Sequence, residues 1–309
     1  MCCLFGIVDY RHSMTVKQKN RILSALATAA EARGTDATGI AYNSAGKLRI
    51  YKRPWPAHCM RFCVPDDAYV IMGHTRMTTQ GSAKHNYNNH PFIGQTITGP
   101  FALAHNGMLW NDSWLRQAHE IPKPQIETDS YVAVQLIEQK RTLDFKCLQQ
   151  MAEEIEGSFT FTILDTEDNL YFIKGDSPLC IYQFPRLGFI LYASTEEILK
   201  KALLSTGLLN RKHRAIPLHS GEILQINAVG TSTRSRFDDS NLFPGWRTSP
   251  WHPWSHSART SPFLSDRQHL EEIRSVALSF GFTPEDIDKL ASQGFSPDEI
   301  EEFLYGYEL

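Results

Sequence analysis

The spacing of apolar residues separates helices from strands along the first part of the chain. Apolar positions recur every three or four residues in four segments, which is typical of helices with one buried face. These segments are residues 15–33, 130–140, 143–156 and 195–204. Short apolar runs bounded by turn residues predict strands at residues 4–10, 37–42, 48–52, 69–74, 101–105, 159–164, 170–173, 179–184, 189–193 and 222–226. Strands and helices come in groups rather than in strict alternation, which favours an α+β architecture with layered sheets.

The composition changes after residue 229. Residues 230–265 are rich in Ser, Thr, Arg, Pro and Trp, so we expect a linker, or an arm that docks partly on an apolar surface. Residues 266–309 then show helical spacing, and Thr283 and Ser296 each precede a proline and an acidic residue, as helix N-caps do. We therefore expect three parts: a domain over residues 2–229, the linker, and a small three-helix module. We expect the module to serve docking or homo-oligomer formation, with recruitment of a partner as the alternative.

Charge and cysteine content exclude several classes of protein. The 309 residues carry a formal net charge of −3, so no broad attraction to nucleic acid or to an anionic membrane surface is expected. No apolar run approaches the ~18 residues that span a bilayer, and the first residues do not form a signal peptide. Six cysteines are few for this length, which predicts reduced thiols and a cytoplasmic protein.

The second residue is a candidate nucleophile. Removal of Met1 would leave Cys2 with a free α-amine and a thiol on the same residue. An α-amine has an ordinary pKa of ~7.7–8.0, so it can accept the proton of its own thiol near neutral pH. The alternative is that a cysteine at this position is incidental, which is the commoner case for an isolated Met-Cys. Cys3 could be mistaken for the nucleophile, but it would lack a free amine.

Three further motifs lie at strand or helix ends. Arg76, with Thr79 beside it, could clamp a carboxylate, although such an arginine is more often part of a surface salt bridge. Asn106 and Gly107 could supply a side-chain amide and a backbone N–H to an oxyanion, although Asn-Gly is also a common turn. Asp129 could bind an ammonium group, although helix capping is the commoner role at such a position.

Taken in order, these motifs resemble the class II glutamine amidotransferases, which include the glutaminase domains of glucosamine-6-phosphate synthase and amidophosphoribosyltransferase. That family begins with a processed Cys-Gly-Ile-x-Gly-Ile stretch, and residues 2–7 read Cys-Cys-Leu-Phe-Gly-Ile. The further matching segments are residues 33–40, 73–81, 89–91, 105–107, 127–129, 175–179, 193–194 and 220–223. The resemblance covers about residues 2–228 and implies the four-layer αββα sandwich of the N-terminal-nucleophile (Ntn) hydrolases.

The resemblance also implies a role for each matching residue. Cys2 would attack the side-chain amide of glutamine and form a thioester. Asn106 and Gly107 would form the oxyanion hole. Arg76 and Thr79 would bind the α-carboxylate of glutamine, and Asp129 its α-amino group. Ammonia would leave first, and water would then release glutamate. No cofactor is implied.

The sequence departs from the family pattern at several places. Met77 and Gln80 replace a tryptophan and a histidine of glucosamine-6-phosphate synthase, and Cys3 replaces a glycine. No acceptor-activating domain follows residue 229, so we expect ammonia to pass to a separate synthetase or acceptor protein. Two alternatives remain: a catalytically silent protein that binds glutamine or a partner, and an amidase for another γ-glutamyl substrate. His58-Cys59 with Cys63 could suggest zinc, but no second Cys/His pair follows, so no metal is expected.

Overall fold

The computed structural model describes most of the chain in two separate compact units, residues 1–247 and 248–309. The described residues are 2–242, 270, 273–274, 277, 282–293 and 300. None of their helices is both long enough and apolar enough to cross a membrane. The six cysteines form no disulfide bond with one another.

The first unit contains a seven-stranded antiparallel sheet with the strand order β11-β9-β10-β1-β4-β2-β3. Its strands are β1 (Cys3–Val8), β2 (Ala37–Ser44), β3 (Lys47–Arg53), β4 (Val70–Arg76), β9 (Cys180–Phe184), β10 (Phe189–Ala193) and β11 (Arg214–Ala215). All six residues of β1 are buried, because the strand lies at the centre of the sheet between β10 and β4. The start of the chain is therefore among its most enclosed segments.

A second, six-stranded antiparallel sheet has the order β13-β12-β8-β7-β6-β5. Its strands are β5 (Phe92–Thr96), β6 (Gly99–Leu109), β7 (Gly157–Leu164), β8 (Leu170–Lys174), β12 (Glu222–Ile226) and β13 (Ser232–Arg236). β13 lies within the segment that the sequence predicts as a linker. Its residues are polar and mostly exposed at a sheet edge, so they lack the apolar alternation that marks a strand.

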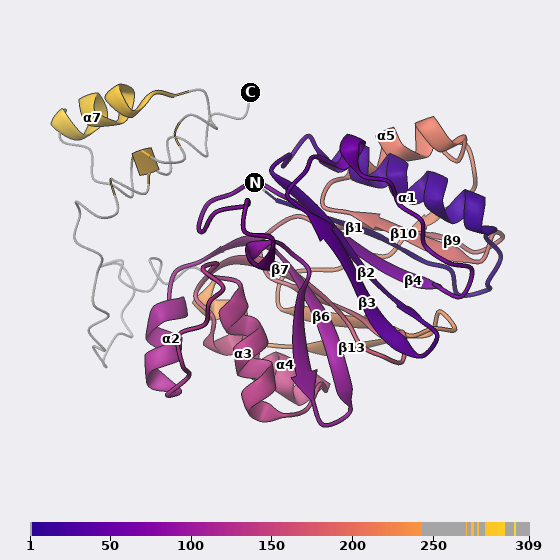
Figure 1. The fold of residues 1–309 in the computed structure, drawn as a ribbon, viewed down its shortest axis with the longest axis horizontal. Helices are drawn as coiled ribbons and strands as arrows, with labels where there is room; N and C mark the ends of the chain where they lie inside the picture. The colour runs from indigo at the N-terminus through magenta and orange to yellow at the C-terminus, as the bar shows by residue number, and fades with distance from the viewer. Residues whose placement is uncertain are drawn as a thin grey trace. The chain divides into compact units, whose positions relative to one another are not determined.

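The two sheets face each other, and helices cover their outer surfaces (Figure 1). The helices α1 (Val16–Ala30) and α5 (Glu196–Thr206) share a buried core with the first sheet. The helices α3 (Tyr131–Lys140) and α4 (Phe145–Glu154) share another with the second sheet, and α2 (Asp112–Ala118) contributes Leu115 to it. A third core fills the space between the sheets. The expected four-layer αββα sandwich is confirmed.

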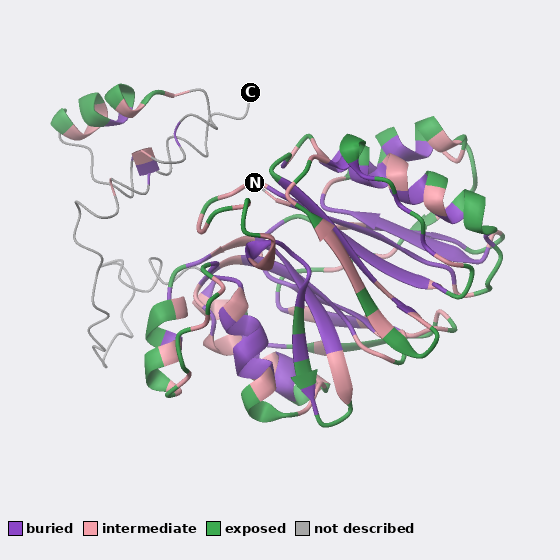
Figure 2. Ribbon diagram, in the orientation of Figure 1, coloured by how far each residue is buried: buried purple, intermediate pink, exposed green. Residues whose placement is uncertain are grey.

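Alternation along β1 directs its side chains into two different cores. Cys3, Phe5 and Ile7 belong to the core beneath the helices. Leu4 and Val8 belong to the core between the sheets. Because successive side chains of a strand point to opposite faces, the second residue of the chain is turned toward the second sheet. Figure 2 shows the buried strands between helices whose outer faces are exposed.

The helix boundaries follow capping chemistry. Thr15 caps α1, and the side chain of Gln18 bonds back to the Thr15 backbone, which forms a capping box. Thr195 caps α5, and Gly207 ends it in the left-handed region at φ 73°. The first unit also has three short 3₁₀ helices, at Ala57–Cys59, Asn86–Asn88 and Asp239–Asn241.

The second unit is described over a few residues only. Its helix α7 (Pro284–Ser292) has Thr283 as N-cap and a capping box with Asp286, as the sequence predicts. Ile287 packs with Ile273, Ala277 and Ile300 in a small apolar core. The remainder of the predicted three-helix module, including the predicted cap at Ser296, lies outside the described residues, as do residues 243–265 of the predicted linker.

Candidate active site

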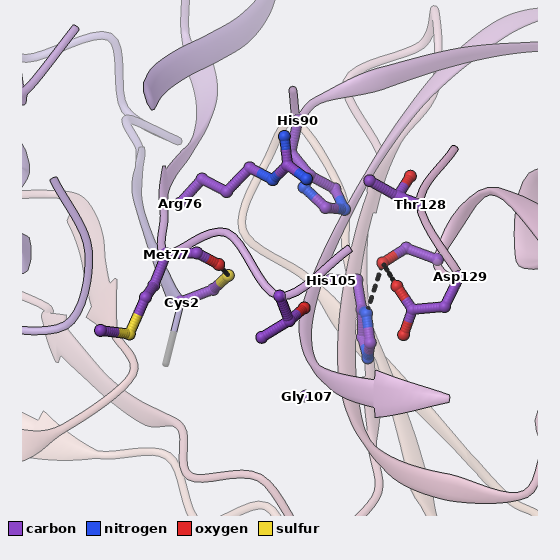
Figure 3. A pocket seen from close by; sticks show the side chains of 10 residues that line it. Cys2, Arg76, Met77, His90, His105, Gly107, Thr128 and Asp129 are labelled. Carbon is purple, nitrogen blue, oxygen red and sulfur yellow. Dashed lines mark hydrogen bonds between the residues drawn. The ribbon is translucent and has the colours of Figure 1, made fainter. Parts of the chain in front are cut away.

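A pocket opens where the two sheets meet near the start of the chain (Figure 3). Five segments of the chain contribute to it: the residue before β1, the end of β4 with the following loop, the residues just before β5, the end of β6, and the turn before α3. Its lining residues are Cys2, Arg76, Met77, Thr79, His90, His105, Gly107, Thr128, Asp129 and Ser130. Five of the six residues that the sequence nominates therefore line one pocket, and the sixth, Asn106, lies between two of the lining residues.

Cys2 lies just before the start of β1, the central strand of the first sheet. β1 pairs with β4 so that Cys3 lies opposite Thr75, which brings Cys2 next to the end of β4. Arg33 Nε donates to the Cys2 carbonyl at 2.9 Å, and Cys2 Sγ lies 3.5 Å from the Met77 carbonyl oxygen. Burial raises the pKa of the Cys2 thiol, and the positive charge of Arg76 acts in the opposite direction. A thiol that is neutral at rest needs a base at the moment of attack, which the α-amine of a processed N-terminus would be.

Arg76 is almost fully buried, at 3% exposure, and its guanidinium binds neighbouring oxygens. Nη1 donates to Asn89 Oδ1 at 2.8 Å. Nη2 donates to the backbone oxygens of Gln80 and Gly81, so the loop after β4 folds back over the guanidinium. A guanidinium has five N–H hydrogens, and those not engaged here remain for a carboxylate in the pocket.

Asp129 lies on the far side of the pocket from Cys2 (Figure 3). It is 4% exposed, and its Oδ2 accepts a 2.6 Å hydrogen bond from the Leu109 backbone N–H. Ser130 Oγ lies 3.2 Å from Asp129 Oδ1 and 2.7 Å from His105 Nδ1. The carboxylate is thus fixed in position by β6 and by its own neighbour, and it supplies a negative charge opposite the thiol.

Gly107 and Asn106 lie at the end of β6. Gly107 has a φ of 133°, and a Cβ there would lie 2.0 Å from the Ser158 carbonyl oxygen, so only glycine fits. Asn106 is 1% exposed, and its Nδ2 donates to Ser194 Oγ at 3.2 Å. Asn106 itself is not among the lining residues, although His105 and Gly107 on either side of it in the sequence are.

Two buried histidines, His90 and His105, line the pocket, and a third, His74, packs against His90; the sequence motifs do not single them out as site residues. His74 and His90 lie with their ring centroids 4.3 Å apart, and His105 is 6.5 Å from His90. Burial lowers the pKa of all three, that of His74 from 6.5 to about 3. They are therefore neutral near pH 7. Within the described residues, both ring nitrogens of His90 and the hydroxyl of Thr128 have no hydrogen-bond partner, so they can bind a polar ligand.

We expect these histidines to make the first unit sensitive to acid. The unfolded chain binds protons at its histidines near their ordinary pKa of 6.5, whereas the three buried histidines of the folded chain bind protons only at a lower pH. The free energy of unfolding should therefore be fully retained above about pH 6.5. Below this pH it should fall, by up to about 1.4 kcal/mol per pH unit for each histidine. Urea unfolding at a series of pH values measures the slope. His90→Gln should make it shallower, and the exposed His219→Gln should not; equal slopes would contradict the prediction.

The candidate zinc residues do not assemble. His58 Nδ1 contacts Glu31 at 2.9 Å, and Cys59 and Cys63 are exposed free thiols. Over the described part of the chain, no three His, Cys, Asp or Glu side chains are grouped as metal ligands.

Comparisons with known proteins find similarity to glutamine amidotransferases. Residues 74–201 match the family model described as a glutamine amidotransferase domain. The glutamine–fructose-6-phosphate aminotransferase of Listeria innocua is 32% identical over 158 residues, which are 49% of this chain and 26% of that protein. The Staphylococcus aureus enzyme of the same name is 30% identical over 190 residues, which are 59% of this chain and 30% of that protein. This chain thus matches less than a third of either relative.

Two solved structures have the same fold. The glutamine phosphoribosylpyrophosphate amidotransferase of B. subtilis aligns with a TM-score of 0.58 at 23% identity, over 76% of this chain and 49% of that one. A structure described as the allosteric regulatory enzyme of purine biosynthesis aligns with a TM-score of 0.59 at 23% identity, over 78% of this chain and 50% of that one. At this identity the likeness shows the fold alone.

Proposed function

We propose that this chain, which carries a class II glutamine amidotransferase domain of the Ntn type, hydrolyses the side-chain amide of glutamine to glutamate and ammonia. The observation that carries the proposal is one pocket that holds Cys2, Arg76 and Asp129. A thiol, a guanidinium and a carboxylate match the amide, the α-carboxylate and the α-ammonium of glutamine.

The proposed reaction uses these groups in order. Arg76, helped by Thr79, binds the α-carboxylate, and Asp129 binds the α-ammonium, which directs the amide carbonyl toward Cys2. The α-amine of the processed Cys2 takes the thiol proton as sulfur attacks the amide carbon. Gly107 N–H and Asn106 Nδ2 donate to the oxyanion. The C–N bond then breaks as the protonated α-amine returns the proton to the leaving nitrogen, and water hydrolyses the thioester to release glutamate.

The fate of the ammonia belongs to the proposal as well. We propose that a separate synthetase or acceptor protein receives it. Support comes from the relatives, which are named as aminotransferases that use glutamine and fructose 6-phosphate. Coupling would be visible as faster glutamine hydrolysis when that protein and its substrate are added.

A matched pair of preparations tests the activity. In one, intact mass shows that Met1 has been removed; in the other, an uncleaved N-terminal extension keeps the Cys2 nitrogen in a peptide bond. Both have the same thiol and the same pocket, so we expect glutamate release from the processed protein only. No release from processed, folded protein would refute the enzyme and leave a glutamine-binding protein. Faster release from an N-substituted γ-glutamyl amide than from glutamine would instead indicate an amidase for another substrate.

A further inference from the structure

Ser194 directly follows the last residue of β10 and is fully buried, at 0% exposure. Its backbone N–H donates to the Leu4 carbonyl at 2.9 Å, which continues the pairing of β10 with β1. Ile190 and Tyr192 on the same strand belong to the core between the sheets. By alternation, the side chain of Ser194 is also turned toward that space.

The hydroxyl of Ser194 joins the two sheets at the site. Its Oγ accepts the Leu4 backbone N–H at 2.8 Å, and Leu4 is two residues from Cys2. The same oxygen accepts Asn106 Nδ2 at 3.2 Å from the second sheet. Ala102 and Ala104 precede Asn106 on the face of β6 that is turned to the first sheet, so this bond crosses between the layers. One oxygen atom thus connects the strand of the nucleophile with the strand of the oxyanion donors.

We propose that Ser194 is a positioning residue that orients the Asn106 amide toward Cys2; this inference rests on the proposed glutaminase function. With Leu4 N–H and Asn106 Nδ2 both donating to it, the hydroxyl oxygen uses its two acceptor sites. Asn106 therefore turns its nitrogen, rather than its oxygen, toward Ser194 and the nucleophile strand. Nδ2 keeps a second N–H for the oxyanion. The hydrogen bond from the Leu4 N–H to Ser194 Oγ also fixes the strand that carries Cys2.

Two variants compare this hydroxyl with a matched neighbour. Ser194→Ala removes the acceptor that spans the sheets. Thr160→Val removes another buried hydroxyl, whose 2.6 Å bond goes to the Ser177 carbonyl in the segment between β8 and β9. Removal of an oxyanion donor lowers kcat by ~10²–10³-fold, so misorientation of one should lower it by about 10- to 100-fold with little change in KM. Thr160→Val should retain the kcat of the unmodified protein.

A second readout does not depend on turnover. A chloromethyl ketone analogue of glutamine reacts in two steps. The thiol first adds to the carbonyl carbon and forms an oxyanion. The sulfur then bonds to the methylene carbon as chloride leaves, and the first C–S bond breaks as the carbonyl re-forms. Iodoacetamide reacts by direct displacement of iodide and forms no oxyanion. When the analogue is saturating, so that its binding no longer limits the rate, the ratio of the two rates at Cys2 reports the oxyanion donors. Because Cys59 and Cys63 are exposed, the modification is followed on the N-terminal peptide by mass spectrometry.

We expect Ser194→Ala to lower this ratio by about 10-fold or more. Asn106→Ala should lower it too, and the double variant should lose little more than Asn106→Ala alone, since both changes act through one amide. Should the alanine variant not fold, Ser194→Cys, with its weak acceptor, should show the same direction. An unchanged ratio of the two rates, including equal losses of rate with both reagents, would overturn the proposal. An equal fall of the ratio in Thr160→Val would overturn it too. Absence of glutamate release from the unmodified protein would refute the proposed function while the ratio still tests Ser194.

Discussion

Cys2→Ala should abolish glutamate release, with a loss of at least about 10⁴-fold in kcat, as for other covalent nucleophiles that act with their base as one unit. No other thiol lines the described pocket, and the variant keeps both Arg76 and Asp129. Glutamine should therefore still bind. Initial rates of glutamate formation, together with calorimetric titration of glutamine, separate loss of chemistry from loss of binding.

Cys3→Ala is the control for this experiment. Cys3 is fully buried, and it belongs to the core beneath the helices rather than to the pocket. Its loss should lower stability but leave turnover of the same order. If Cys3→Ala removed activity and Cys2→Ala did not, the assignment of the nucleophile would be wrong.

Asp129→Asn should lower kcat/KM for glutamine by about 10²- to 10³-fold, because it leaves the α-ammonium of the substrate without its buried counter-charge. The replacement has nearly the same shape, and its amide oxygen can still accept the Leu109 N–H that now bonds to Oδ2 at 2.6 Å. The effect should therefore come from charge rather than from refolding of the β6 end. Steady-state kinetics and the urea midpoint together check this.

A substrate without the α-amino group provides the matched comparison. Glutaramate has the same amide and carboxylate as glutamine, so the unmodified protein should strongly prefer glutamine. Asp129→Asn should lose most of that preference, since the discriminating charge is gone. A variant that kept the full preference would show that Asp129 does not contact the α-ammonium.

The sequence predicts much of this fold because the apolar spacing of β1, α1 and α5 and the capping residues of the two helices are visible in the residues themselves. Thr15 and Thr195 cap the two helices as side chains of this type usually do. β5 and α2 were not predicted. The buried positions of the edge strand β5 are Phe92, Gly94 and Thr96, while the apolar Ile93 is exposed, so its sequence shows no apolar alternation. The seven-residue helix α2 buries only Leu115, so it shows no apolar face.

The candidate site was predictable only in part, because some of its contacts join residues that are far apart in the sequence. Cys2, Arg76 and Asp129 have chemistry that suggests a role even without a structure. The contacts of Ser194 and His90 become visible only through long-range geometry. Ser194 contacts Leu4 across 190 positions, and the buried ring nitrogens of His90 have no hydrogen-bond partner among the residues that the structure describes. Such contacts depend on how two sheets are stacked, which local periodicity does not encode.

The central position of β1 also determines the order of events during synthesis. Its two neighbours are β4 and β10, and Phe5 lies opposite Ala193. The first strand therefore cannot complete its sheet until nearly two hundred residues have left the ribosome, which takes about 10–40 s at ~5–20 residues per second. Throughout that interval β1 lacks at least one of its two partner strands. An aminopeptidase thus has time to remove Met1 from the nascent chain before the newly exposed amine is enclosed between the sheets.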